Sequence, residues 1–224
     1  MTPLGPTAAW QEMLDGNHRF VTGDPRHPNQ DVGRRHDLAH QQNPVATLFG
    51  CSDSRLAAEI IFDLGLGDLF VVRNAGQIIG ESIVGSLEYA VEILKVPLIV
   101  VLAHDECGAV RAAIDGTAID AAPLPPNIWK LIAPIIPSAR RVLAQNGGSS
   151  PADIDAEQVG REHLRSTVAN LLQSSELISD AVAEGRLGIV GANYRLAEGT
   201  AVPVITVGID TGSGDDLATQ EGSK

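Results

Sequence analysis

Short apolar runs alternate with segments of helical periodicity through the centre of the chain. Residues 82–94 carry apolar side chains at helical spacing, which turns one face of a helix inward. Residues 98–103 are apolar on both faces, as is typical of a central parallel strand. Strands alternating with helices predict a parallel sheet with covering helices, an α/β fold. The runs that predict strands are 45–49, 69–72, 98–103 and 187–192, followed by an edge strand over 201–207.

The amino-terminal part has a different character. Thr7 is expected to cap a helix that ends near Gly23. Residues 24–43 are polar and contain prolines, which predicts an extended arm. Helix and arm together make up the amino-terminal residues 1–44, and the arm is expected either to wrap a partner subunit or to run over the surface.

The remaining segments complete the domain plan. Residues 116–137 are rich in proline, which predicts a loop with at most a short helix. A serine–proline start at Ser150 predicts a helix that continues to about Glu184. Since no linker divides the chain, residues 1–209 are predicted to form a single domain. The small polar residues 210–224 are expected to be a disordered tail.

Composition and charge narrow the classes of partner. The chain has 224 residues with 44% hydrophobic and 20% charged side chains, an ordinary balance for one globular domain. Its formal charge of −12 opposes binding to nucleic acid or anionic membranes, and 4% aromatic residues leave little for base stacking. Neither a membrane-spanning run nor a signal peptide is evident. These features predict a cytoplasmic protein with a small substrate and no nucleic-acid or membrane partner.

Two strand-to-helix turns carry soft metal ligands. Cys51 follows the first predicted strand, and His104 and Cys107 follow the third. Ligands bind open parallel sheets beyond the carboxyl ends of the strands, at the point where the strand order reverses, so neighbouring strands here would bring the three side chains together. Two cysteines and one histidine suit zinc and leave a fourth position open, as in catalytic sites. Two buried apolar cysteines in a reducing compartment are the plainer alternative.

The turn after the first strand adds a charged pair. Asp53 and Arg55 lie two residues apart, so in an extended turn their side chains point the same way. A bidentate arginine keeps a carboxylate ionised and fixes its direction, so Asp53 is suited to orient a metal-activated water. An ion pair with only a structural role is the alternative.

The motifs GCSDSR (50–55), LFVVRNAG (69–76), SLEYAVEIL (86–94) and VLAHDECGAV (101–110) resemble those of the beta-class carbonic anhydrases. The resemblance implies a lyase that hydrates carbon dioxide reversibly to bicarbonate and a proton, with a zinc-bound hydroxide as the attacking group and one Zn²⁺ per chain. It also implies a four-stranded parallel sheet with an added edge strand. The expected assembly is a homodimer or homotetramer in which amino-terminal arms wrap the partner.

The resemblance also assigns site residues in this chain. It implies zinc ligation by Cys51, His104 and Cys107, with Asp53 and Arg55 as the catalytic pair. The residues that it assigns to substrate binding are Gln42, Phe70, Ala75, Tyr89 and Gly108.

Three other functions remain open on this pattern. A CS2 or COS hydrolase would share the metal ligands and differ in access to the pocket, where a lid formed by the proline-rich segment would matter. A non-catalytic zinc protein would be expected to lose a ligand or the charged pair, and a thiol redox protein would need a closer cysteine motif. Arg73 is expected to pack at a dimer interface. The other histidines, His18, His27, His36, His40 and His163, are expected to be solvated.

Overall fold

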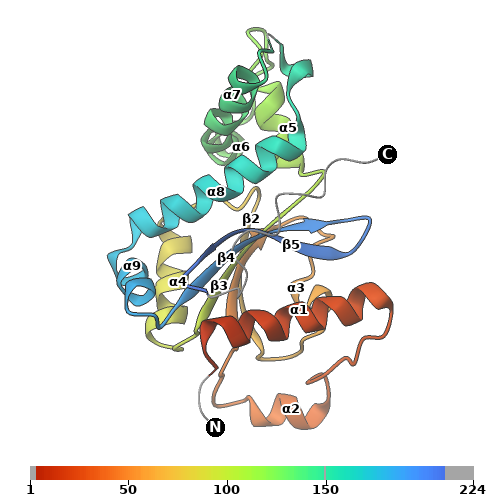
Figure 1. The fold of residues 1–224 in the computed structure, drawn as a ribbon, viewed down its shortest axis with the longest axis vertical. Coiled ribbons are helices and arrows are strands. Elements are labelled where there is room, and N and C mark those ends of the chain that lie inside the picture. Colours follow the sequence, from red (N-terminus) through yellow and green to blue (C-terminus); the bar gives the residue numbers. More distant parts are fainter. Residues whose placement is uncertain (1–3, 149, 210–224) are drawn as a thin grey trace.

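The computed structural model describes residues 4–148 and 150–209 and has a five-stranded sheet at its centre (Figure 1). The strand order is β2-β1-β3-β4-β5; the first four are parallel, and β5 is antiparallel to β4. The predicted α/β fold, a four-stranded parallel sheet with an edge strand, is therefore confirmed. The strands are β1 (Ala46–Cys51), β2 (Leu69–Asn74), β3 (Leu98–His104), β4 (Gly188–Arg195) and β5 (Thr200–Val207).

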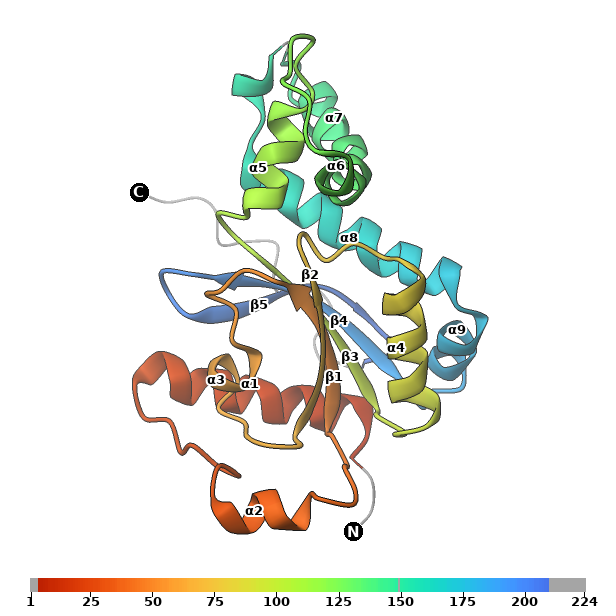
Figure 2. The same cartoon turned by 180° about the vertical axis from the view of Figure 1, so that it is seen from behind.

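Helices bury both faces of the sheet (Figures 1 and 2). Strand β3 shows why: its alternate residues belong to two separate apolar clusters, one on each side. The helices that contribute to the first cluster are α1 (Pro6–Thr22), α3 (Ala58–Ile61), α5 (Gly108–Asp115), α6 (Pro126–Ile132) and α7 (Ile136–Gln145), together with Val159 from the start of α8 (Ala156–Ser174). Those of the second are α4 (Glu81–Glu92), α8 and α9 (Glu176–Ala183). Among the described residues, no helix is both long and apolar enough to cross a membrane.

The first helix begins earlier than its sequence predicts. Thr7 does not cap it; Gly5 occupies the cap position and Pro6 is the first helical residue. Proline suits that position because its fixed φ is already helical and it has no N–H to leave unpaired. The helix ends as expected at Gly23, whose φ of 74° lies in the left-handed region.

The amino-terminal arm is not extended throughout, which corrects the prediction for residues 24–43. A short helix, α2 (Val32–Asp37), forms within it, and the Asp31 side chain caps this helix by accepting the Arg34 N–H. The Asp31 cap satisfies one N–H of the first turn, which stabilises a short helix that the proline content of the segment did not predict.

The proline-rich segment forms more helix than predicted. Within the segment from 116, α6 and then α7 form, joined by a 3-10 turn over Ala133–Ile135. Pro126, Pro134 and Pro137 all lie in the first two positions of their helical segments, where proline costs no hydrogen bond.

The long carboxy-terminal helix is divided. Pro151–Asp153 forms only a 3-10 turn, and α8 and α9 are separated at Ser175. The Ser175 side chain accepts the Ile178 N–H and so starts a new helix in a new direction. The predicted tail, 210–224, lies outside the described residues.

Candidate metal centre

The sheet reverses its strand order beside β1. This strand pairs with β2 on one side and with β3 on the other, so the chain leaves β1 in one direction and later returns on its opposite flank. Cys51 is the last residue of β1 and His104 the last of β3. The condition on which the predicted metal site depended, that the first and third strands are neighbours, is therefore met, and their carboxyl ends form one switch point.

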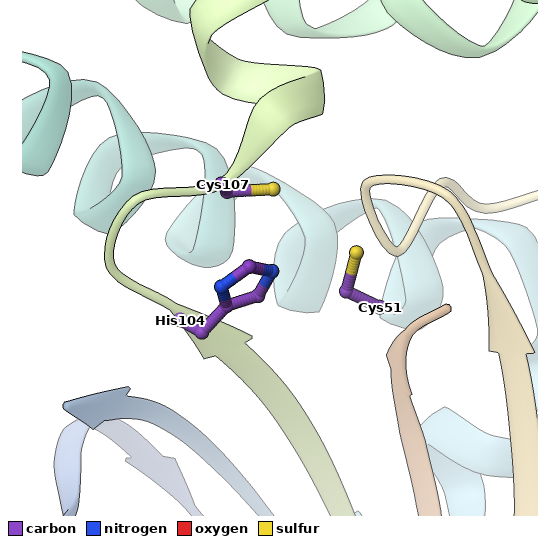
Figure 3. A group of neighbouring side chains, drawn as sticks. All are labelled: Cys51, His104 and Cys107. Carbon is purple, nitrogen blue, oxygen red and sulfur yellow. The ribbon is translucent and has the colours of Figure 1, made fainter. Parts of the chain in front are cut away.

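Cys51, His104 and Cys107 converge at this switch point (Figure 3). One ligand atom from each side chain lies within 4.8 Å of the others, and all three side chains are buried. Among residues 4–148 and 150–209 this is the one group of three or more such side chains that is arranged to share a metal ion. The sequence alone also allowed two buried cysteines with no metal role. In the structure their sulfur atoms lie beside a histidine, which favours the metal site.

His104 presents one ring nitrogen without a protein partner. Its Nδ1 lies 2.7 Å from the Asp105 carbonyl oxygen, and because a carbonyl only accepts, this nitrogen carries the proton. Its Nε2 is buried and has no hydrogen-bond partner. An unpaired buried lone pair that points toward two sulfurs is costly unless a metal takes it, so the residues fit a zinc ion.

The setting of the two sulfurs favours negative charge on Cys51 and opposes it on Cys107. The Cys107 thiol lowers the pKa of Cys51 to about 4 against the opposing effect of burial, and the same contact raises the pKa of Cys107. The Gly76 N–H donates to Cys51 Sγ at 3.4 Å, and Cys107 is the N-cap of α5. A thiolate is what zinc binds, and zinc deprotonates both cysteines on binding.

The Asp53–Arg55 pair forms as predicted. Arg55 Nε lies 2.9 Å from Asp53 Oδ1, and its Nη2 lies 2.8 Å from Oδ2, a bidentate geometry. The Arg55 hydrogen bond holds the pKa of Asp53 far below its usual range. Asp53 Oδ2 is 3.9 Å from His104 Nε2, so the carboxylate borders the ligand cluster.

Comparison with known proteins agrees with this geometry. Residues 46–201 match the carbonic anhydrase family. The chain is 48% identical over 203 residues to carbonic anhydrase 2 of Mycobacterium tuberculosis (strain ATCC 25618 / H37Rv), covering 90% of this chain and 94% of that protein. It is 47% identical over 200 residues to a carbonic anhydrase of Mycolicibacterium smegmatis, covering 89% and 93%.

A solved structure extends the likeness to three dimensions. The beta-carbonic anhydrase CcaA superposes with a TM-score of 0.66 at 26% identity, covering 87% of this chain and 94% of that one. The chain belongs to the beta carbonic anhydrases. A second family structure, the Coccomyxa enzyme in complex with acetazolamide, matches at 25% identity with a TM-score of 0.65 and covers 78% of each chain.

Arg73 holds the backbone of the metal turn in this carbonic anhydrase. Its Nε donates to the Cys51 carbonyl oxygen at 2.9 Å and its Nη2 to that of Asp53 at 2.6 Å. The sequence predicted that Arg73 packs at a dimer interface, and these contacts within one chain were not predicted. The register explains them, because Arg73 pairs with Gly50 on the neighbouring strand, one residue before the ligand.

His163 was expected to be solvated, and that expectation is wrong. The residue is 4% exposed on α8, and its Nε2 lies 2.8 Å from the Gly76 carbonyl oxygen. A signal was available: His163 falls on the buried helical stripe that includes Val159 and Thr167.

Two of the predicted substrate residues lie next to a ligand or to a residue that contacts one. Gly108 is the first residue of α5 and directly follows Cys107. Ala75 is exposed in the turn after β2, next to Gly76, whose N–H contacts the Cys51 sulfur.

The other three lie away from the metal turn of the same chain. Phe70 pairs with Thr47, which precedes Cys51 by about 13 Å of strand at roughly 3.3 Å per residue. Its ring packs against Tyr89, with centroids 6.0 Å apart. Gln42 precedes β1 altogether and is exposed, at the opposite end of that strand from the ligand.

Proposed function

We propose that this chain catalyses the reversible hydration of carbon dioxide to bicarbonate and a proton, with one zinc ion held by Cys51, His104 and Cys107. The observation that carries the proposal is the buried cluster of these side chains, in which His104 Nε2 lacks a partner. Its relatives at 47–48% identity are named carbonic anhydrases, which supports the same reaction here.

When bound, zinc supplies a nucleophile near neutral pH by lowering the pKa of water to about 7. Asp53 and Arg55 give this nucleophile its direction. Because Arg55 keeps the pKa of Asp53 far below neutrality, the carboxylate stays ionised and accepts a hydrogen bond at Oδ2 without retaining the proton. We assign orientation to Asp53, support to Arg55, and release of the reaction's proton to buffer.

The product anion has a natural donor at the start of α5. Gly108 is the first residue of that helix, and N–H groups at a helix amino end favour negative charge. The space beside this residue is open, since a Cβ there would meet nothing within 4 Å. We assign bicarbonate contact to the Gly108 N–H.

We further propose that a second copy of the chain completes the carbon dioxide pocket. Carbon dioxide is small and uncharged and needs apolar walls, yet in one chain Phe70 and Tyr89 lie away from the metal turn, and Tyr89 is 46% exposed. Gln42 likewise reaches a metal site only across an interface. A homodimer or homotetramer would place these residues beside Ala75 of the partner's metal site.

The site also bears on compartment and substrate. Two thiols that must stay reduced to bind zinc suit the cytoplasm, which is where we propose that the protein acts.

The CS2 or COS hydrolase alternative gains no support from the relatives' names. A non-catalytic zinc protein would be expected to have lost a ligand or the Asp53–Arg55 pair. All five residues are in place, so this alternative is not supported.

Stopped-flow carbon dioxide hydration with a pH indicator tests the proposal. Zinc-loaded protein is assayed at mildly alkaline pH, above the value near 7 expected of zinc-activated water. We expect fast hydration in wild type and its loss, together with the zinc, in Cys107→Ser. An inactive wild type that holds one zinc per chain would contradict the proposal, and turnover of CS2 in its place would favour the alternative.

A further inference from the structure

A buried histidine outside the ligand set is connected to the metal turn. His163 lies on α8, 87 residues after Gly76 in the sequence, and its Nε2 lies 2.8 Å from the Gly76 carbonyl oxygen. Because a carbonyl only accepts, Nε2 donates. The side chain is 4% exposed, so water does not compete for this bond.

Gly76 links the His163 hydrogen bond to a metal ligand. The same residue donates its N–H to Cys51 Sγ at 3.4 Å. Its φ of 80° is in the left-handed region that glycine adopts without penalty. A Cβ at this position would lie 3.0 Å from Ala109 Cβ and 3.1 Å from Ile135 Cδ1, so the backbone is also packed from the side of α5 and the 3-10 turn.

We propose that His163 is a positioning residue of the metal centre: by holding the Gly76 carbonyl, it keeps the Gly76 N–H on the Cys51 sulfur. The inference rests on the proposed zinc site. A hydrogen bond to a coordinating thiolate withdraws charge from the sulfur, and such outer contacts typically govern metal affinity by about 10–100-fold. A histidine that served only to pack α8 would leave the sulfur's electronic state unchanged.

Two substitutions separate the hydrogen bond from packing. In His163→Gln the amide nitrogen is as many bonds from Cα as the imidazole Nε2, so the donor is kept. His163→Leu retains apolar bulk and removes the donor. Each protein is loaded with Co²⁺, whose thiolate charge-transfer absorption reports the electron density on sulfur, and zinc affinity is measured by competition with a chromophoric chelator.

We expect wild type and His163→Gln to share the same absorption bands and zinc affinity. His163→Leu should shift the bands to longer wavelength and bind zinc about 10–100-fold more weakly. Unchanged bands and affinity in a folded His163→Leu would overturn the inference while leaving the zinc site intact. A wild type with no thiolate bands would overturn both.

A second measurement does not use His163→Leu and so covers the case in which that variant does not fold. With cadmium-113 in place of zinc, the N–H···S bond should transmit a scalar coupling between the metal and the Gly76 amide proton. Detection of that coupling in wild type and in His163→Gln supports the inference. Its absence in wild type would overturn it.

Discussion

At the scale of single residues, two arginines stabilise different parts of the metal turn. Arg55 forms a bidentate ion pair with the Asp53 carboxylate, whereas Arg73 donates hydrogen bonds to the backbone carbonyl oxygens of Cys51 and Asp53. The first contact sets the direction and charge of a side chain, and the second sets the path of the backbone that carries a ligand. Substitutions at the two positions should therefore differ in effect.

Replacement of Arg55 should damage catalysis and spare the zinc. Arg55→Lys keeps the charge but loses the bidentate geometry, and we expect kcat/KM to fall about 10–100-fold, the usual cost of a lost supporting contact. Metal content by mass spectrometry should stay at one zinc per chain. Arg111→Lys, in an exposed pair with Asp115, is the matched control and should keep wild-type activity. Full activity in Arg55→Lys would contradict the assigned role.

A methyl group at Gly76 should cost more than the same change at another left-handed glycine. Gly23 has a φ of 74° and open space around it, whereas a Cβ at Gly76 meets Ala109 and Ile135. Gly23→Ala should lose about 1–2 kcal/mol of unfolding free energy from conformation alone. Gly76→Ala should lose more, and its zinc affinity should fall as well. Urea unfolding of both proteins checks this, and equal losses would show that the packing at Gly76 is loose.

At the scale of elements, a buried carboxylate anchors the amino-terminal arm to its own subunit. Asp63 accepts hydrogen bonds from Arg19 Nε at 2.6 Å and from the backbone N–H groups of Arg26 and His27 at 2.9 Å. Its side chain is 1% exposed. Three donors on one buried carboxylate fix where the chain leaves α1, whatever the rest of the arm contacts.

Asp63→Asn should therefore loosen the arm. The substitution removes the charge and part of the acceptor capacity at a buried site, which typically costs about 1–3 kcal/mol. Urea unfolding at neutral pH measures the loss, and limited proteolysis should locate new cleavage within residues 24–43. The exposed Asp24→Asn is the control and should match wild type. An arm in Asp63→Asn as protected as in wild type would refute the anchor.

The same aspartate should give a recognisable pH dependence. Burial raises the pKa of Asp63, but the hydrogen bonds from Arg26, Arg19 and His27 outweigh it, so the net shift is downward. A lowered folded-state pKa contributes stability above the unfolded value of about 3.9, and that contribution is lost as pH falls through the folded value. The stability gap between wild type and Asp63→Asn should therefore shrink on acidification. A difference in unfolding free energy between wild type and Asp63→Asn that grew at low pH would contradict the lowered pKa of Asp63.

Sequence predicted best those elements whose burial is complete. The strand over 98–103 was evident because both of its faces are apolar. The ligand cluster was predicted from two turns at strand ends, on the condition that the two strands are neighbours. The segment 116–137 was predicted to hold at most a short helix, and its helical content was underestimated because prolines stand at the starts of the helical segments. The roles of Arg73 and His163 depend on register and on tertiary contact with Gly76, which a single sequence does not display. The assignments of Gln42, Phe70, Ala75, Tyr89 and Gly108 remain predictions.

At the scale of the whole molecule, apolar side chains flank the edge strand β2. On α4 and just after it, Tyr89 is 46% exposed and Ile93 is 61% exposed. Exposed apolar groups beside an unpaired strand edge are typical of a surface covered by another chain. Such cover would also bring the remote pocket residues to a metal site.

Charge placed on that surface should dissociate the proposed assembly. Ile93→Asp is expected to reduce the mass in solution, measured by light scattering, toward that of a single chain, and carbon dioxide hydration should fall with it. Ile119→Asp is the control because Ile119 is fully exposed in the loop after α5 and should leave mass and activity unchanged. An Ile93→Asp variant with the wild-type mass would place the interface elsewhere.

The central claim, zinc-dependent hydration of carbon dioxide at the Cys51–His104–Cys107 cluster, is tested most directly by titrating zinc into metal-free protein and following the hydration rate. We predict no activity without metal and a linear rise that saturates at one zinc per chain, with no rise at all in Cys107→Ser. Hydration by the metal-free protein, or a zinc-saturated wild type that stays inactive, would contradict it.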